Sequence, residues 1–170
     1  MKKVIAAIKA EVQGHSQIPR DGGPFTLVGR ADRIERRADG ALAILDYKTG
    51  TPPSQKEVDA GLAPQLLLEA AMAEAGAFGP DLAARAGELI YWHLTGGYEP
   101  GEVRSLFKGD ATAIAAAVAA ARDSLGTLID TYDQPGRCYL SQPHPARAPR
   151  FSDYAQLARV AEWAAAGEEL

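Results

Sequence analysis

Cysteine is nearly absent from this chain of 170 residues, in which Cys138 is the single example. One cysteine excludes an intramolecular disulfide, a metal site built only from cysteines and an iron–sulfur cluster held within this chain. Such scarcity is typical of a reducing compartment, so we expect a cytoplasmic protein. The sequence also lacks an apolar run of the roughly 18 residues that cross a bilayer, and its N-terminus has no signal-peptide pattern. We therefore expect no membrane partner.

An excess of positive charge is absent too. Lysine and arginine number 18 against 22 acidic residues, which gives a net charge of −4 and a pI near 5.4. That balance counts against a protein that coats DNA through bulk charge, but it leaves room for local phosphate binding. The length suits one compact domain, so we expect residues 1–170 to form a single domain.

The first third of the chain reads as strands. Val4 to Val12 mixes apolar and polar residues, and Gly14 to Pro24 is rich in turn formers. Two apolar-rich runs follow, Phe25 to Arg37 and Ala41 to Lys48, and the Asp-Gly pair between them predicts an antiparallel hairpin.

The rest of the chain predicts helices that alternate with strands. A capping box at Ser54 opens a short helix, and a second helix begins at Pro64 and ends near Ala75. The later elements are two strands over 88–95 and 102–107, a long helix after Asp110, an irregular proline-rich segment over 134–150, and a last helix from about Tyr154 to Ala166. We therefore expect an α/β fold with a central mixed sheet flanked by helices.

Acidic and basic side chains meet at the end of the predicted hairpin. Side chains of a strand alternate between its two faces. This alternation predicts two shared faces: Leu42, Ile44, Asp46 and Lys48 on one strand, and Val28, Arg30, Asp32 and Ile34 on the other. Two carboxylates and an ammonium at one strand end are costly unless something binds there, and Mg²⁺ would satisfy them. On the three letters D-x-K alone, a solvated surface ion pair is the more common explanation.

Three motifs in order extend this pattern. They are Gly29 to Glu35 (GRADRIE), Ile44 to Gly50 (ILDYKTG) and Pro64 to Leu66 (PQL). In this combination the chain resembles the PD-(D/E)XK nuclease superfamily, in its RecB-like branch, and more narrowly the C-terminal nuclease domain of the AddB subunits of bacterial AddAB helicase–nucleases. The ending Phe151 to Trp163 is similar to the tail of that family. The resemblance covers most of the chain and implies a restriction-endonuclease-like core.

The resemblance implies a role for each matching residue. Asp32 and Asp46 would be metal ligands, with the main-chain carbonyl of Tyr47 as a third oxygen. Lys48 would orient the attacking water and offset charge at the phosphate, and Gln65 would contact the site or the DNA backbone. The implied metal is Mg²⁺, with Mn²⁺ as a substitute, because phosphodiester hydrolysis needs an activated water and compensation of negative charge.

The sequence departs from the family pattern in three ways. An acidic or histidine ligand on a helix before the first strand is missing, since only residues 1–3 precede that strand; Glu11 lies on the strand itself. Glu69 stands where many relatives carry a tyrosine, one helical turn after Gln65. The cysteines of an iron–sulfur cluster are missing as well. We therefore expect a cluster-free C-terminal fragment of a larger subunit that lacks the N-terminal motif helix.

Four arginines lie close to the predicted site on the first hairpin strand: Arg30, Arg33, Arg36 and Arg37. A solvated strand edge and contact with DNA phosphates are about equally consistent with this cluster. The implied partners are DNA and an AddA-like helicase–nuclease subunit.

Three functions fit these observations. The first is a Mg²⁺-dependent DNA exonuclease domain of an AddAB/RecBCD-type enzyme for double-strand break repair and recombination. The second is a stand-alone RecB-like or Cas4-like exonuclease. The third is a nuclease-like module that has lost catalysis and serves in DNA binding or subunit docking, against which the retention of Asp32, Asp46 and Lys48 argues.

Overall fold

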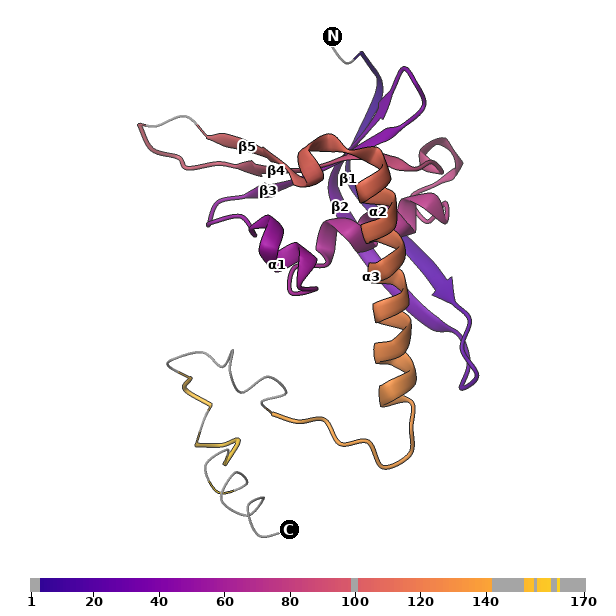
Figure 1. Cartoon of the computed structure of the whole chain (residues 1–170), viewed down its shortest axis with the longest axis vertical. Helices are drawn as coiled ribbons and strands as arrows, with labels where there is room; N and C mark the ends of the chain where they lie inside the picture. Colours follow the sequence, from indigo (N-terminus) through magenta and orange to yellow (C-terminus); the bar gives the residue numbers. More distant parts are fainter. Residues whose placement is uncertain (1–3, 99–100, 142–151, 155, 160–161, 163–170) are drawn as a thin grey trace. The chain divides into compact units, whose positions relative to one another are not determined.

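The computed structural model describes residues 4–98, 101–141, 152–154, 156–159 and 162. The chain divides into two compact units, Met1–Asp130 and Thr131–Leu170, which are described separately. The elements, drawn in Figure 1, are in chain order β1 (Ile5–Ile18), β2 (Phe25–Arg37), β3 (Leu42–Lys48), α1 (Gln55–Asp59), α2 (Gln65–Glu74), the 3₁₀ turn η1 (Pro80–Leu82), β4 (Ala86–His93), β5 (Glu102–Ser105), the 3₁₀ turn η2 (Leu106–Gly109) and α3 (Ala111–Tyr132).

The five strands form one mixed sheet in the order β1-β2-β3-β4-β5. Strands β3 and β4 are parallel, and the chain between them contains α1 and α2, as a parallel crossover requires. The other neighbouring strands are antiparallel. This arrangement confirms the predicted α/β fold with a mixed central sheet and flanking helices.

The hairpin between β2 and β3 turns where the Asp-Gly pair predicted it. Arg37 N–H donates to the Ala41 carbonyl across the turn, and the Asp39 carboxylate accepts the Ala41 N–H. Gly40 has a φ of 86°, a value that glycine adopts at no steric cost. The pairing then runs from Arg36 opposite Leu42 to Arg33 opposite Leu45.

The first strand is longer than the sequence predicts. Residues Gly14 to Ile18, expected as part of a turn, continue β1 and pair with the first half of β2. Gly14 and Gly29 are register partners at the point where this strand pair lies against the end of α2. A Cβ atom on Gly14 would lie 2.6 Å from Phe78 Cδ1, and one on Gly29 would lie 2.9 Å from Met72 Sδ. We infer that the two glycines serve close packing here rather than a turn.

The helices begin and end close to the predicted positions. Ser54 and Glu57 form the capping box of α1. Pro64 precedes α2 as its N-cap instead of occupying its first turn, and α2 ends at Glu74 before Gly76. Asp110 caps α3 by accepting the N–H groups of Thr112 and Ala113. The strand predicted over 102–107 stops at Ser105, because η2 begins at Leu106.

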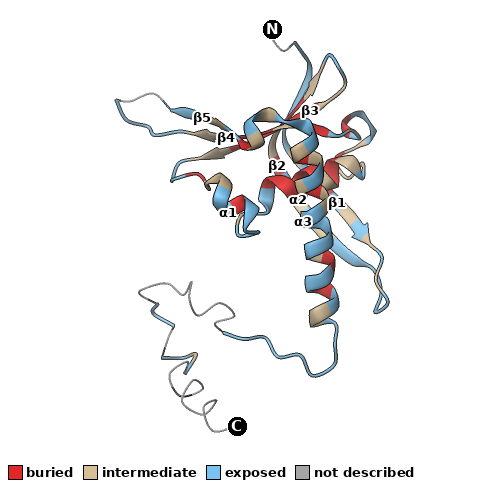
Figure 2. Ribbon diagram, viewed as in Figure 1, coloured by how far each residue is buried: buried red, intermediate tan, exposed pale blue. Residues whose placement is uncertain are grey.

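The core lies between the helices and one face of the sheet. It joins strand residues such as Ile34, Ile44 and Leu89 to residues of α2 and to Ile114 of α3. Figure 2 shows these buried positions gathered around α2 and the central strands. A second, smaller cluster on the other face consists of Ala43, Leu45, Ile90 and the partly buried Trp92. The two clusters follow the alternation of β3, whose even-numbered residues face the helices.

Helix α3 has the length and composition of a membrane-spanning helix, the one such case in the described part of the chain. The expectation from sequence was different, because Arg122 and Asp123 interrupt its apolar residues. Such a helix is weak evidence for a membrane, since core helices pass the same test. Its residues Ile114 and Val118 are at most 1% exposed within the core. These two residues attach α3 to the core, although only 22% of its apolar window is buried.

In the second unit, the rings of Tyr132 and Tyr139 stack with centroids 4.8 Å apart. Residues 134–141 form turns, bends and irregular chain, as their composition predicts. The last predicted helix, from about Tyr154 to Ala166, lies largely outside the described residues, and so does much of the Phe151–Trp163 ending.

Candidate active site

Asp46 and Lys48 lie side by side at the end of β3, on the face that the helices cover. Leu42 and Ile44 precede them on this face and are fully buried, as the alternation predicts. Asp46 is 2% exposed, whereas the Lys48 side chain is 31% exposed and reaches solvent. Lys48 Nζ donates a hydrogen bond to Asp46 Oδ1 at 3.2 Å and lies 2.9 Å from Oδ2 as an ion pair. The predicted carboxylate–ammonium pair is therefore present.

Asp32 lies where β2 and β3 separate. The backbone pairing of these strands ends at Arg33 and Leu45. Beyond that point Asp32 Oδ2 accepts the backbone N–H of Tyr47 at 2.9 Å. The carboxylate thus holds the end of β3 next to β2 through a side chain. The roles of Asp32 and of the Tyr47 carbonyl as metal ligands stay predictions.

The predicted shared face of β2 is partly wrong. Ile34 lies in the core, but Val28 is 71% exposed and Arg30 is exposed, so these residues do not share its face. Ala31, three residues before Ile34, is fully buried in the same core cluster. The alternation therefore changes phase near Asp32. Glu11 on the neighbouring strand, between the register pairs of Ala10 and Val12, has a φ of 56°, which marks an irregularity in the ladder at this level.

Gln65, the first residue of α2, connects the pair to the helix. Its amide nitrogen Nε2 donates to Asp46 Oδ1 at 2.6 Å, and its Oε1 accepts from Lys48 Nζ at 3.0 Å. Asp46, Lys48 and Gln65 therefore form a closed triangle of polar contacts. The structure brings together three of the four residues predicted for catalysis through direct bonds, with Asp32 attached through the backbone of Tyr47.

Glu69, which stands where many relatives carry a tyrosine and was not predicted as a site residue, joins this cluster. It lies one turn after Gln65 on α2, is 5% exposed, and accepts from Gln65 Nε2 through Oε1 at 3.1 Å. Its other oxygen, Oε2, is buried without a hydrogen bond. Burial raises the pKa of Glu69 to about 7, and the charges of Asp46 and Asp32 act in the same direction. The spacing of four residues from Gln65 is the signal that places both on one helix face.

Tyr91 of β4 is also close to this cluster and was missed as a site residue. It is the register partner of Asp46 and is 1% exposed. Lys48 Nζ lies 5.9 Å from the centre of its ring. Burial and the charges of Asp46 and Glu69 raise the pKa of Tyr91 to about 12, so it is a neutral phenol at physiological pH. The sequence carries no signal for this contact because the pairing of β3 with β4 is long-range.

The donor set fits a hard divalent cation. Asp46 and Glu69 are buried carboxylates of one cluster, and Glu69 Oε2 is buried without a hydrogen bond, while Asp46 Oδ2 faces Lys48. Such cations prefer carboxylate oxygens. In the described residues no three acidic, histidine or cysteine side chains already form a metal cage. A cation at this place would therefore keep several waters, as Mg²⁺ commonly does.

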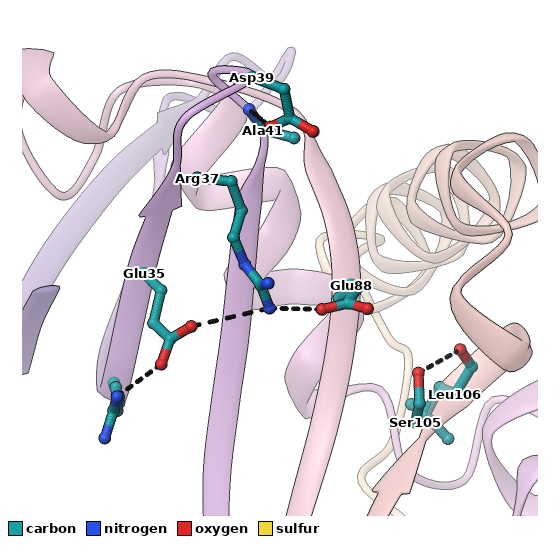
Figure 3. A network of polar contacts seen from close by, with 8 residues as sticks. Glu35, Arg37, Asp39, Ala41, Glu88, Ser105 and Leu106 are labelled. Carbon is teal, nitrogen blue, oxygen red and sulfur yellow. Dashed lines mark hydrogen bonds and ion pairs between the residues drawn. The ribbon is translucent and has the colours of Figure 1, made fainter. Parts of the chain in front are cut away.

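The four arginines of β2 each have a partner. Arg30 pairs with Glu11, and Arg36 donates to the main-chain carbonyl of Asp81 at 2.7 Å. Figure 3 shows the ion pairs of Glu35. Its Oε1 lies 2.6 Å from Arg33 Nη2, and its Oε2 lies 3.7 Å from Arg37 Nη2.

Two further contacts complete the arginine network. Arg37 also reaches Glu88, and Arg33 lies 3.4 Å from the Tyr47 hydroxyl. Contact of Arg30, Arg33 and Arg36 with DNA stays a prediction.

Proteins of Rickettsia bellii and Rickettsia typhi, described as an uncharacterized protein and uncharacterized protein RT0391, are each 41% identical to this chain over 71 residues. These alignments cover 42% of this chain and 8% of each relative. The crystal structure of SSO0001 aligns with a TM-score of 0.41 at 17% identity, over 84% of this chain and 62% of that one.

A family model matches nearly the full length of the chain. The model describes the PD-(D/E)XK nuclease superfamily and matches residues 2–165. This range includes the β2–β3 hairpin, Lys48 and the start of α2, which carry the polar cluster. The chain therefore belongs to the PD-(D/E)XK nuclease superfamily.

Proposed function

We propose that this chain hydrolyses DNA phosphodiester bonds with a divalent metal ion, Mg²⁺ or in its place Mn²⁺, held at the end of β3. The observation that carries the proposal is a pair of buried carboxylates joined by Gln65, of which Asp46 forms an ion pair with Lys48 and Glu69 keeps Oε2 without a hydrogen bond. Two buried carboxylates beside the ammonium of Lys48 are costly unless a further cation balances them. Family membership supports the same chemistry.

Each residue of the cluster has a place in this proposal. Asp46 and Asp32 offer carboxylate oxygens, and the metal supplies a Lewis acid that activates water and neutralises phosphate charge. Lys48 is fixed by Asp46 and Gln65, with its ammonium partly open to solvent. In that position it offsets the negative charge that develops on the phosphate and orients the attacking water. Gln65 is a positioning residue, because it bonds both partners of the pair.

We further infer that the chain acts as the exonuclease part of an AddAB-type helicase–nuclease in double-strand break repair. The order and spacing of GRADRIE, ILDYKTG and PQL support this narrower assignment. It implies DNA and an AddA-like subunit as partners and a cytoplasmic location. The relatives that match are much longer than this chain, which is compatible with a nuclease part of a larger protein.

Cleavage of labelled DNA by the full chain tests the proposed chemistry. We expect hydrolysis with millimolar Mg²⁺ and none with EDTA. Asp46→Asn keeps the shape of the side chain and should abolish hydrolysis. Asp123→Asn, a change of an exposed carboxylate on α3, should leave it unchanged. Hydrolysis by Asp46→Asn at the rate of the Asp123→Asn control would contradict the proposal.

The topology of the DNA tests the narrower assignment. Together with the AddA-like subunit of the same genome and ATP, the chain should degrade linear duplex DNA and leave covalently closed circles intact. Equal cleavage of closed circles would show an endonuclease. Degradation of linear DNA that is unchanged by Asp46→Asn would assign the exonuclease activity to the partner.

A further inference from the structure

Glu69 is a buried carboxylate whose contacts are incomplete. It is 5% exposed, and among the residues that the structure describes its one hydrogen-bond partner is the neutral amide of Gln65. In the described part of the chain, the salt bridges include no cation within ion-pair distance of it. Glu69 Oε2 is buried with no hydrogen bond at all. A carboxylate in this state carries a desolvation cost that nothing in the apolar packing around it offsets.

The oxygen of Glu69 that has no hydrogen bond belongs to the same polar cluster as the Asp46 carboxylate. Gln65 Nε2 donates to Asp46 Oδ1 at 2.6 Å and to Glu69 Oε1 at 3.1 Å, so one nitrogen holds both carboxylates. Each carboxylate uses one oxygen for this amide; Asp46 Oδ2 then lies 2.9 Å from Lys48 Nζ, whereas Glu69 Oε2 has no hydrogen bond. The two carboxylates come from different elements, β3 and α2, and no local turn geometry explains their approach.

We propose that Glu69 is a further ligand of the divalent metal ion at Asp46, and that Gln65 holds the two carboxylates in place for it. This inference rests on the proposed function, because it assumes the same metal ion. Mg²⁺ and Mn²⁺ take several carboxylate oxygens, and coordination would give Glu69 Oε2 a partner and balance the second buried carboxylate. α2 then contributes a ligand as well as the positioning amide.

Metal affinity, measured without DNA, separates this role from a structural one. Isothermal titration of the full chain with Mn²⁺ is compared among the wild type, Glu69→Gln, Asp46→Asn and Glu35→Gln. Glu69→Gln keeps the size of the side chain and its acceptor for Gln65 but loses the charge. We expect at least a roughly tenfold weaker Mn²⁺ affinity for Glu69→Gln and little or no binding for Asp46→Asn. Glu35→Gln removes an equally buried carboxylate on the other face and should keep the wild-type affinity.

Circular dichroism shows whether each variant folds. Two further variants replace those that do not fold. If Glu69→Gln does not fold, Glu69→Asp keeps the charge, withdraws the carboxylate by one methylene and should weaken Mn²⁺ binding as well. If Glu35→Gln does not fold, Asp123→Asn replaces it as the control.

The outcomes distinguish the inference from the proposed function. Wild-type Mn²⁺ affinity in folded Glu69→Gln or Glu69→Asp, together with loss of binding in Asp46→Asn, overturns the role of Glu69 and leaves the nuclease proposal standing. Absence of Mn²⁺ binding in the wild type overturns both.

Discussion

Glu35 and Glu69 are two glutamates that are buried to the same extent, 5% exposed each, on opposite faces of the sheet. Glu35 lies on β2 between Arg33 and Arg37 and forms an ion pair with each of them. Glu69 lies on α2, has a neutral amide as its hydrogen-bond partner, and keeps one oxygen without a hydrogen bond. Its pKa is raised to about 7, mainly by burial.

The difference shows which buried carboxylate is compensated by cationic side chains of the protein itself. A carboxylate between two guanidinium groups is compensated within the protein, and removing one partner of such a pair is destabilising. Glu69, next to Asp46 and Asp32, has no ion pair among the described residues, and the proposed metal ion would compensate it. Incomplete pairing, more than burial or charge alone, is therefore our reason for proposing the helix-covered face as the functional one.

The largest effect should come from Lys48, the lysine of the helix-covered face. We expect Lys48→Ala to lower the rate of DNA hydrolysis by roughly 10³-fold or more, because charge stabilisation at the phosphate is lost. Lys56→Ala, a change of an exposed lysine on α1, is the matched control and should retain the wild-type rate. A gel assay of labelled DNA measures both rates. Equal rates for the two variants would contradict a role of Lys48 in hydrolysis beyond that of an exposed surface lysine.

The next effect is on the free energy of unfolding and concerns Glu35 and its two arginine partners. Glu35→Gln should destabilise the protein by about 3 to 5 kcal/mol, because Arg33 and Arg37 lose their shared buried partner. Urea unfolding in EDTA at pH 8 measures it. A loss below about 1 kcal/mol would show that the network in Figure 3 contributes little to folding.

Glu69 should have the opposite influence on stability in the metal-free protein. In the folded state it keeps its proton up to about pH 7, whereas the unfolded chain releases it near pH 4.5. Folding therefore favours the protonated form, and stability decreases as the pH rises from 4.5 through 7. The loss amounts to at most about 3 kcal/mol above pH 7.

Urea unfolding of the wild type and Glu69→Gln in EDTA, at pH 5.5 and pH 8, measures this difference. We expect Glu69→Gln to gain stability relative to the wild type as the pH rises. A constant difference between the two proteins at both pH values would mean that Glu69 does not titrate in this range.

The smallest effect should come from the positioning amide. Gln65→Ala removes hydrogen bonds to Asp46, Lys48 and Glu69 but no charge. We expect a roughly tenfold lower rate of hydrolysis, smaller than the loss for Lys48→Ala. Single-turnover rates at saturating Mg²⁺ make the comparison. A rate and a DNA affinity equal to those of the wild type would show that Gln65 has no role in the site.

The sequence was sufficient to predict the elements that depend on local signals. The Asp-Gly turn, the capping box at Ser54 and the aspartate cap of α3 each follow from chemistry within a few residues, and all are present. The even-numbered face of β3, with Asp46 and Lys48 at its end, follows from strand alternation in the same way. These features do not depend on distant parts of the chain.

The features that the sequence did not predict depend on contacts between distant parts of the chain. Residues Gly14 to Ile18 look like a turn because of their composition, but pairing with β2 extends them as strand. The change of phase in β2 near Asp32 occurs opposite Glu11 of β1, whose φ of 56° is irregular for a strand, and neither feature has a signal in the local sequence. The contact of Tyr91 with the site depends on the parallel pairing of β3 and β4.

Glu69 is an intermediate case. Its spacing from Gln65 placed it on the correct helix face, but the sequence did not show that this face is buried against Asp46. The unpaired oxygen that distinguishes Glu69 from Glu35 is visible only once the packing is known.

The dependence of DNA hydrolysis on Mg²⁺ concentration, compared between the wild type and Asp46→Asn, tests the central claim most directly. We predict that the wild type has no activity in EDTA and gains it with increasing Mg²⁺, whereas Asp46→Asn stays inactive over the same range. Hydrolysis by the wild type without metal, or by Asp46→Asn with the wild-type dependence on Mg²⁺, would contradict a metal site at the end of β3.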